Sequence, residues 1–250
     1  MFCYYWCMDK TEYKINHQYQ PTNTTCSPTA LSMLLGYYGH EISVGDISTK
    51  VPQVKNSKGE NFGTINQQMA TWCENLGFDV VLYTADVQVI DQSWSKLSSI
   101  EVIERLEARK AGLKVPSLGE LWNDAYCQAY IDYIKSGGEL HIVNAITSNM
   151  LYELLKEGPL LPCLSFDTLY GKGRTSNAGE NKTKPNDING KAWNHSVVIY
   201  GNDEGGNFLV ADPWEKPGIH VIEPDVMIAA IGTAQLECDN LVFQLRNHRG

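Results

Sequence analysis

The chain has no long hydrophobic run and no cluster of basic residues. No window approaches the eighteen or more apolar residues that a membrane helix needs, and the opening MFCYYWCMDK lacks both the basic lead and the apolar core of a secretion signal. We therefore expect neither a membrane span nor an export signal, with the cytoplasm as the default location. The 20 Lys and Arg are outnumbered by 29 Asp and Glu, for a net charge of −9. Such a field repels a phosphate backbone, which excludes nucleic acid as a partner.

The sequence also lacks the usual cysteine motifs. Seven cysteines are scattered along it, at Cys3, Cys7, Cys26, Cys73, Cys127, Cys163 and Cys238. They form no CxxC pair and have no close pair of histidines, so neither a zinc knuckle nor a redox dithiol is indicated, and we expect no cofactor. Cys73, Cys127 and Cys163 lie among apolar neighbours and are expected to be small buried hydrophobes. Cys3 and Cys7 either pair with each other or remain free.

Periodic apolar residues predict the most clearly defined helix near the start of the chain. Apolar side chains fall at Ala30, Leu31, Leu34, Leu35 and Tyr38, which is the spacing of a helix with one buried stripe. A proline in the first turn and glycines near the end are typical of helix boundaries. We therefore predict a helix over residues 27–38.

The later segments predict a mixed fold. Helical patterns are expected at 65–76, 92–137 and 148–157, and strands at 77–84, 160–166, 195–201, 208–214 and 240–245. Helices come first and strands last, with no Pro- or Ser-rich joint between them, which favours a single α+β domain over 1–250 with a mostly antiparallel sheet. The section at about 92–137 is interpreted as a helical insertion. The segment 168–193, rich in Gly, Asn, Lys and Thr, is either a functional loop or a tolerated insertion.

Cys26 stands where a loop of Thr and Asn leads into the first predicted helix. A hydroxyl would cap a helix there as well, so the sulfur needs another explanation. A thiol is a strong nucleophile only as a thiolate, and its ordinary pKa of about 8.5 leaves little of that form at neutral pH. Unpaired N–H groups and the positive end of the helix dipole stabilise the anion. We predict that Cys26 is a nucleophile.

A predicted hairpin supplies a base and a group to hold it. If the turn is centred between Asp203 and Glu204, His195 faces Asp212 across the two strands, with their Cβ atoms about 4.5–5.5 Å apart. A turn shifted by one residue makes the pair diagonal and still within reach. Asp212 is followed by Pro213, where the chain leaves the sheet. His195 and Asp212 are therefore the predicted base and orienting carboxylate.

A side-chain amide near the nucleophile completes the set. Attack by sulfur on a carbonyl creates an oxyanion, which N–H donors stabilise. Gln20 precedes Cys26 in the loop that feeds the helix and is the predicted donor, together with the backbone N–H of Cys26. Gln18 is the alternative.

These residues resemble a known family. The stretch from Gln20 to Cys26 leading into SPTALSMLLGYYG, followed by KEGPLLPCLSF, NHSVVIYGND and FLVADPW, resembles the C39-like branch of the papain-like cysteine peptidases. The resemblance extends over about residues 17–245. It implies a papain-like fold with the nucleophile helix packed on the sheet, and it implies for Gln20, Cys26, His195 and Asp212 the roles given above.

The chain departs from that family in two places, and several functions remain open. Members commonly carry glycine after the cysteine where this chain has Ser27, and the helical section at 92–137 exceeds the minimal fold. The first hypothesis is a cysteine peptidase that acts on a peptide or protein substrate. The alternatives are an amidase or endopeptidase for peptidoglycan, an acyl-transferring relative, a peptide-binding module that has lost turnover, and a structural protein.

Overall fold

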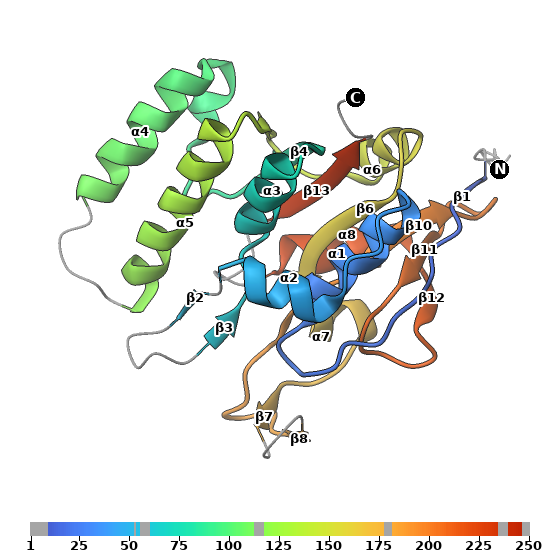
Figure 1. Ribbon diagram of the computed structural model, residues 1–250. Coiled ribbons are helices and arrows are strands. Elements are labelled where there is room, and N and C mark those ends of the chain that lie inside the picture. The colour runs from blue at the N-terminus through green and yellow to red at the C-terminus, as the bar shows by residue number, and fades with distance from the viewer. Residues whose placement is uncertain are drawn as a thin grey trace, which may run out of the picture.

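The computed structural model describes residues 10–52, 54–55, 61–112, 118–177, 182–234 and 240–246 (Figure 1). The helices are α1 (Cys26–Tyr37), α2 (Val44–Lys50), α3 (Asn66–Asn75), the 3-10 turn η1 (Gln92–Lys96), α4 (Ser99–Gly112), α5 (Leu118–Lys135), α6 (Ser148–Leu155), α7 (Phe166–Tyr170) and α8 (Pro224–Gly232). The strands are β1 (Thr11–Glu12), β2 (Val54–Lys55), β3 (Asn61–Gly63), β4 (Asp79–Thr84), β5 (Glu139–Ile142), β6 (Leu160–Ser165), β7 (Thr175–Asn177), β8 (Thr183–Pro185), β9 (Asn194–Ser196), β10 (Val198–Asn202), β11 (Phe208–Ala211), β12 (Ile219–Ile222) and β13 (Leu241–Arg246).

One large sheet organises the described residues. Its strands run in the order β12-β11-β10-β6-β13-β4-β5, with β1 added beside β10 and β9 beside β6. Every described pair is antiparallel except β4 with β5. The predicted α+β class with a mostly antiparallel sheet is therefore confirmed.

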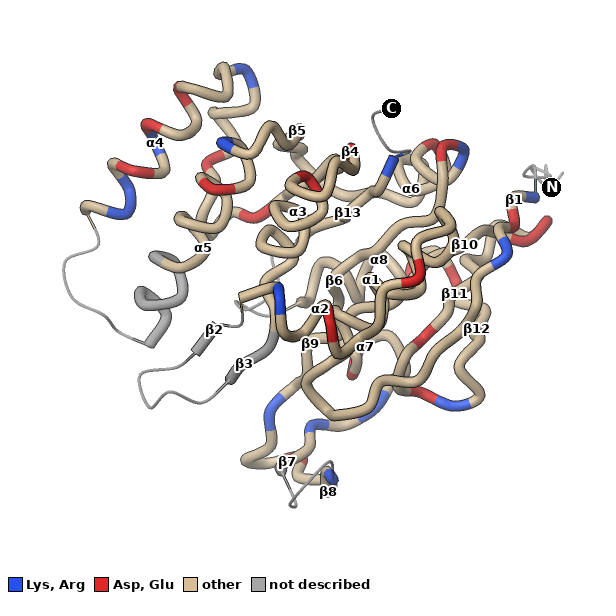
Figure 2. Tube along the Cα trace, in the orientation of Figure 1, with Lys and Arg blue, Asp and Glu red and all other residues tan. Residues whose placement is uncertain are grey.

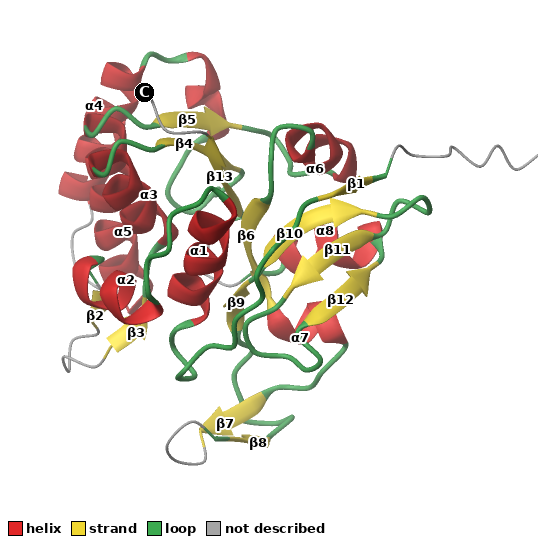
Figure 3. Ribbon diagram, turned by 45° about the vertical axis from the view of Figure 1, so that its right-hand side comes forward, coloured by secondary structure: helices red, strands yellow, loops and turns green. Residues whose placement is uncertain are grey.

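The sheet carries a separate apolar layer on each face. Successive side chains of a strand point to opposite faces, so Val198 and Tyr200 of β10 join one cluster while Val197 and Ile199 join the other. The first cluster contains the buried residues of α1, α2, α3, α4 and α5. The second contains those of α6, α7 and α8. Figure 3 shows α1 on one side of the sheet, with α7 and α8 on the other.

The first predicted helix forms where the apolar spacing predicts it. Helix α1 begins at Cys26 and ends at Tyr37, within one residue of the predicted ends at 27 and 38. Ala30, Leu31, Leu34 and Leu35 are completely buried. The predicted packing of this helix on the sheet is confirmed by its contacts with β6, β9 and β10.

The section predicted as a helical insertion contains η1, α4 and α5, and α4 packs on α5. Only Val102 and Leu106 of α4 are buried, and charges of both signs are spread along the helix (Figure 2). Its outer surface is therefore polar and solvated. Among the described helices, none has the length and apolar character to cross a bilayer.

The predicted hairpin forms, but its register differs from the expectation. A turn centred between Asp203 and Glu204 pairs Val198 with Leu209, whereas the structure pairs Val198 with Ala211, and a bulge follows Ile199. Strand β9 also leaves this hairpin and pairs with β6, which places His195 opposite Leu164. The prediction that His195 faces Asp212 across two paired strands is therefore wrong.

The cysteines divide into two kinds. Cys73 and Cys127 are completely buried, as expected, and burial raises the pKa of Cys73 far above the ordinary thiol value. Cys163 is buried, as predicted, but it is disulfide-bonded and not merely a small apolar side chain. Cys3 and Cys7 lie outside the described residues.

Candidate active site

Cys26 is the first residue of α1, and the loop before it leaves the end of the helix open. The hydroxyl of Thr25, the residue before the helix, makes no capping hydrogen bond. It accepts from the N–H of Thr22 at 3.1 Å and donates to the Thr22 carbonyl at 3.0 Å instead. The first N–H groups of a helix have no partner within it. Around the sulfur, these groups are therefore free of a side-chain cap and favour negative charge.

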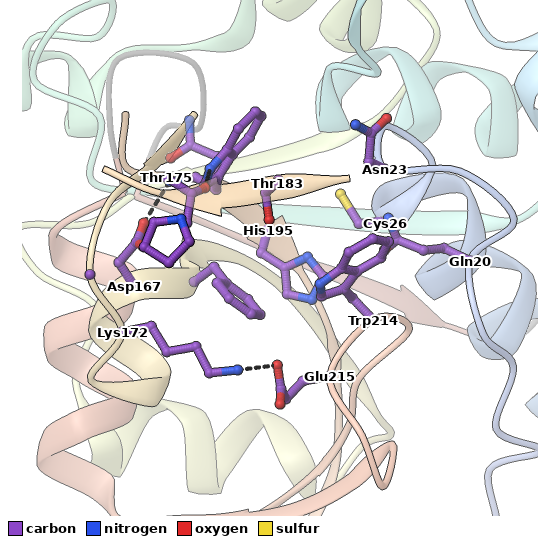
Figure 4. A pocket seen from close by; sticks show the side chains of 15 residues that line it. Gln20, Asn23, Cys26, Asp167, Lys172, Thr175, Thr183, His195, Trp214 and Glu215 are labelled. Atoms are coloured by element: carbon purple, nitrogen blue, oxygen red, sulfur yellow. Dashed lines mark hydrogen bonds and ion pairs between the residues drawn. The ribbon is translucent and has the colours of Figure 1, made fainter. Parts of the chain in front are cut away.

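His195 is brought to Cys26 by the sheet. Strand β9 pairs with β6 and also contacts α1, so the imidazole lies beside the start of that helix. The Cys26 thiol and the His195 side chain line the same cavity, and His195 is the main group that lowers the pKa of the thiol. The close-up in Figure 4 shows the sulfur directed to the side of the cavity where His195 lies. The edge of the Phe166 ring packs on the imidazole, with the ring centres 5.4 Å apart.

Asp212 lies just beyond the end of β11 and holds the far side of the imidazole. The distance from Nε2 of His195 to Oδ1 of Asp212 is 2.9 Å. The same oxygen accepts the backbone N–H groups of Trp214 at 2.6 Å and Glu215 at 2.8 Å. The second oxygen, Oδ2, accepts the hydroxyl of Tyr170 at 2.6 Å. The carboxylate is fully buried but has a donor on each oxygen, which is the condition for an ionised group in a protein interior.

These contacts shift the acidity of all three groups. Burial alone raises the pKa of the Cys26 thiol, but the hydrogen bond and charge of His195, with smaller help from Ser196 N–H and Ser27, hold that pKa below its ordinary value. Burial opposes the charged form of His195, whereas Asp212 and Cys26 raise the pKa of His195 to about 10. Burial likewise opposes ionisation of Asp212, and His195 together with Tyr170 lowers the pKa of Asp212 despite it. The arrangement therefore favours a thiolate beside an imidazolium.

Gln20 lies beside Cys26, and Gln18 does not. The backbone N–H of Gln20 donates to the Pro213 carbonyl at 2.7 Å, and its side-chain Nε2 donates to the Thr22 carbonyl at 2.6 Å. Gln20 lines the same cavity as Cys26 and His195. Its amide nitrogen carries two hydrogens, so one remains for another acceptor. Gln18 donates to Ser32 at 3.3 Å and lines a different cavity.

Ser27, which stands where glycine is common in the resembling family, is directed into the protein. Its hydroxyl lies 2.8 Å from the hydroxyl of Ser196, and both residues are buried. The sulfur of Cys26 is 3.9 Å from the Ser27 oxygen. Because Ser27 does not line the cavity beside Cys26, its side chain leaves that space unobstructed.

A cavity of about 390 Å³ opens beside Cys26 and His195. Its walls include the aromatic side chains of Phe166, Trp193 and Trp214. Lys172 and Glu215 form an ion pair at 2.5 Å on another side (Figure 4). Nothing in the described part of the chain groups three His, Cys, Asp or Glu side chains closely enough to hold a metal ion.

The segment 168–193, predicted as a loop or insertion, contributes to this cavity. Its strands β7 and β8 pair with each other, and Thr175, Thr183 and Pro185 from them line the cavity. The indole N–H of Trp193 donates to the hydroxyl of Thr175, which ties the hairpin to the residues before β9. Residues 178–181 lie outside the described part.

Helix α7, which carries Phe166 and Tyr170, contributes to the site without being predicted from the sequence. This helix directly follows β6, and the Ser165 hydroxyl caps it by accepting the N–H of Thr168 at 3.3 Å. Gly171 ends it in the left-handed conformation with φ of 59°. A serine followed six residues later by glycine was the only local signal for so short a helix.

The N-terminal part of the chain matches a known protein family. Residues 12–108 match the Peptidase_C39 like family. This match confirms the resemblance predicted from the sequence, and it contains Gln20 and Cys26. His195 and Asp212 lie beyond its end, so their assignment rests on the contacts described above.

Similar solved structures are more distant. One is a protein of Bacillus anthracis assigned as a C39-like peptidase, with 11% identity, 97% of this chain and 100% of that chain covered, and a TM-score of 0.49. Another is the peptidase domain of Streptococcus ComA, a bifunctional ABC transporter of a quorum-sensing pathway, with 14% identity, 94% and 99% covered, and a TM-score of 0.41. No curated protein matches this chain.

Proposed function

We propose that this protein is a cysteine peptidase of the C39-like type. Cys26 is the nucleophile, His195 is the general base and acid, and Asp212 orients His195. Gln20 and the backbone N–H of Cys26 stabilise the oxyanion. The family match over residues 12–108 supports the peptidase class, and the geometry of the site supports the residue roles.

One observation carries the proposal. The thiol at the open start of α1 shares a cavity with an imidazole that lowers the pKa of the thiol, and Nε2 of that imidazole lies 2.9 Å from a fully buried carboxylate oxygen. Since Nε2 is engaged by Asp212, Nδ1 is the ring nitrogen available to the sulfur. This is the order of nucleophile, base and orienting group that covalent hydrolysis requires.

The reaction has two stages. The thiolate attacks the scissile carbonyl and forms a C–S bond, and the imidazolium gives its proton to the leaving amine as the C–N bond breaks. Water then attacks the thioester, with His195 taking its proton, and the acid product leaves as Cys26 is regenerated. The open N–H groups at the start of α1 and the free hydrogen of the Gln20 amide are the available donors to the oxyanion.

The cavity favours an enzyme over a peptide-binding module that has lost turnover. The argument for the silent module is the side chain of Ser27, but that side chain bonds Ser196 and does not enter the cavity. A peptide or protein segment is the proposed substrate, because the aromatic walls accept apolar side chains. Peptidoglycan cleavage and acyl transfer to an amine or thiol are outcomes that the assays below distinguish.

Selective alkylation tests the nucleophile without knowledge of the substrate. We expect iodoacetamide at about pH 6 to modify Cys26 before any other thiol of the native protein, because only a thiol of lowered pKa is ionised there. Cys73 and Cys127 are internal controls, since both are completely buried. His195→Ala is expected to abolish the preference. Slow and uniform labelling would contradict the proposal.

Substrate screening then tests turnover. The wild-type protein is incubated with peptide libraries and, separately, with purified peptidoglycan, and the Cys26→Ala variant serves as the control. Peptide cleavage that is lost in the variant supports the peptidase, and products joined to an added amine indicate acyl transfer. Selective alkylation without cleavage of either substrate would support the silent module.

A further inference from the structure

The carboxylate of Asp212 has two oxygens with different partners. Oδ1 accepts His195 and the backbone N–H groups of Trp214 and Glu215, at 2.9, 2.6 and 2.8 Å. Oδ2 accepts one hydrogen bond from the described part of the chain, and it comes from the Tyr170 hydroxyl at 2.6 Å. Asp212 is fully buried, so without that hydroxyl Oδ2 would have no donor.

We propose that Tyr170 is a positioning residue of the proposed triad, whose hydroxyl holds Asp212 in its ionised form and in line with His195. The inference rests on the proposed function, since it assigns Tyr170 a role in the same reaction. Tyr170 does not line the cavity that Cys26 and His195 share. It acts through Asp212 and not on the substrate.

The surroundings of Tyr170 fix the direction of its hydroxyl. It is the last residue of α7, which is capped by Ser165 at one end and ended by Gly171 at the other. The ring packs at 5.1 Å from the ring of Phe166 and at 5.1 Å from that of His220. The first of these neighbours also packs on the imidazole of His195. The same short helix therefore contacts both the base and the carboxylate that orients it.

The hydroxyl can serve only as a donor here. An ionised carboxylate accepts and does not donate. Burial and the charge of Asp212 raise the pKa of Tyr170 far above its ordinary value, so the phenol keeps its proton. A hydrogen bond to an ionised group is stronger than one between neutral groups.

Several other charged or titratable groups face the Asp212–His195 pair and its tyrosine. From the N-terminal loop, Nε2 of His17 lies 2.7 Å from the carbonyl of Asp212. Gly218, with φ of 92°, lies so close to the His17 ring that a Cβ there would collide with it. The remaining groups are Cys26 on α1, Lys172 after α7, Glu215 beyond β11 and His220 on β12. None of them donates to Oδ2.

Tyr170→Phe tests the proposal because it removes the hydroxyl and keeps the ring. We expect kcat for peptide cleavage to fall by about tenfold, the size of effect typical for loss of a hydrogen bond to a charged group. KM is expected to remain unchanged, since the residue does not line the cavity. Removing an O–H donor raises the proton affinity of the Asp212–His195 pair, so the alkaline limb of the pH profile is expected to move to higher pH.

Tyr152→Phe is the matched control. The Tyr152 hydroxyl also donates at 2.6 Å, but to the backbone carbonyl of Gly206, and its ring stacks on Phe208 in the same apolar layer. This variant is expected to lose stability without a change in the alkaline limb. If Tyr170→Phe also loses stability without a shift of the alkaline limb of the pH profile, Tyr170 has only a structural role and the proposal is overturned.

Two further measurements keep the outcomes separate. If the wild-type protein cleaves no peptide, the proposed function fails, and NMR titration of the His195 ring in the wild type and in Tyr170→Phe still judges the inference. An upward shift of that titration supports it, and no shift overturns it. Site-specific 3-fluorotyrosine at position 170 has nearly the same shape as tyrosine and is a stronger hydrogen-bond donor. It is expected to lower the pH at which the His195 ring titrates. An unchanged titration with this residue would also overturn the proposal.

Discussion

Nε2 of His195 lies 2.9 Å from Oδ1 of Asp212, although the strands that carry these residues do not pair with each other. Strand β9 pairs with β6, whereas β11 pairs with β10 and β12. The contact forms because Asp212 lies beyond the end of β11, where two backbone N–H groups hold its carboxylate. The position of the Asp212 carboxylate therefore depends on the loop after β11 as much as on the sheet.

The reactivity of Cys26 is expected to follow an unusual pH profile. The lowered pKa of Cys26 keeps thiolate present below the ordinary value of about 8.5, and the raised pKa of His195 keeps its proton up to about pH 10. Alkylation should therefore be fast at pH 6 to 8, while peptide cleavage should fall above about pH 10. In His195→Ala, the imidazole no longer counteracts the effect of burial, which raises the pKa of Cys26. The pH profile of Cys26 alkylation should therefore move to higher pH. Equal profiles for the two proteins would contradict the pairing.

Asp212→Asn is expected to destabilise the fold in a pH-dependent manner. The lowered pKa of Asp212 stabilises the fold above the unfolded value of about 3.9, and this stabilisation is lost as the pH falls through the folded value. The raised pKa of His195 also stabilises the fold. This contribution is fully present below about pH 6.5 and is lost as the pH rises through about 10. The free energy of unfolding of Asp212→Asn should therefore fall furthest below that of the wild type between about pH 4 and 6.5, by about 3 kcal/mol. Urea unfolding across this range measures it, and a constant difference would argue against the ion pair.

The Ser27 and Ser196 hydroxyls are expected to be coupled. Ser196→Ala leaves the buried Ser27 hydroxyl without this partner and should cost about 1–3 kcal/mol of unfolding free energy. Ser27→Ala should lower the unfolding free energy much less in the Ser196→Ala variant than in the wild type, because the double variant leaves neither hydroxyl buried without its partner. A double-mutant cycle by urea unfolding gives the coupling. Strictly additive losses would show that the two hydroxyls do not bond each other.

Replacement of Gln20 should reduce turnover without reducing thiol reactivity. Gln20→Ala removes an oxyanion donor, and we expect kcat to fall by about 10²–10³ fold. Alkylation of Cys26 should change little, because that reaction forms no oxyanion at a carbonyl. Gln18→Ala is the matched control, since this glutamine bonds Ser32 and lines another cavity. Equal losses in both variants would contradict the role of Gln20.

The local features of the fold could be predicted from the sequence. The apolar stripe of α1 and the proline in its first turn gave the helix ends to within one residue. Apolar runs likewise predicted β4, β6, β11 and β13. These elements follow from periodicity and turn chemistry, which a single sequence contains. The number of domains remains a prediction.

The contacts between distant segments could not be predicted in the same way. The hairpin register depends on a bulge after Ile199, and nothing in the sequence shows that β9, just before β10, pairs with β6 and not with the chain beyond β11. Tyr170 was missed because its partner Asp212 is 42 residues away and α7 is too short for a periodic pattern. His195 and Asp212 were still chosen together, because both lie near the base of the predicted hairpin. Their catalytic role remains a prediction.

The two apolar layers on opposite faces of the sheet have a consequence for inactivation. The sulfur belongs to a helix of one layer, and the tyrosine that supports the carboxylate belongs to a helix of the other. If these residues act as proposed, loosening of one face is expected to break the contacts among Cys26, His195, Asp212 and Tyr170 while the other face stays folded. On heating, the proposed peptidase activity is expected to be lost before the helical circular dichroism signal. The remaining secondary structure would therefore be a poor measure of the fraction of active molecules.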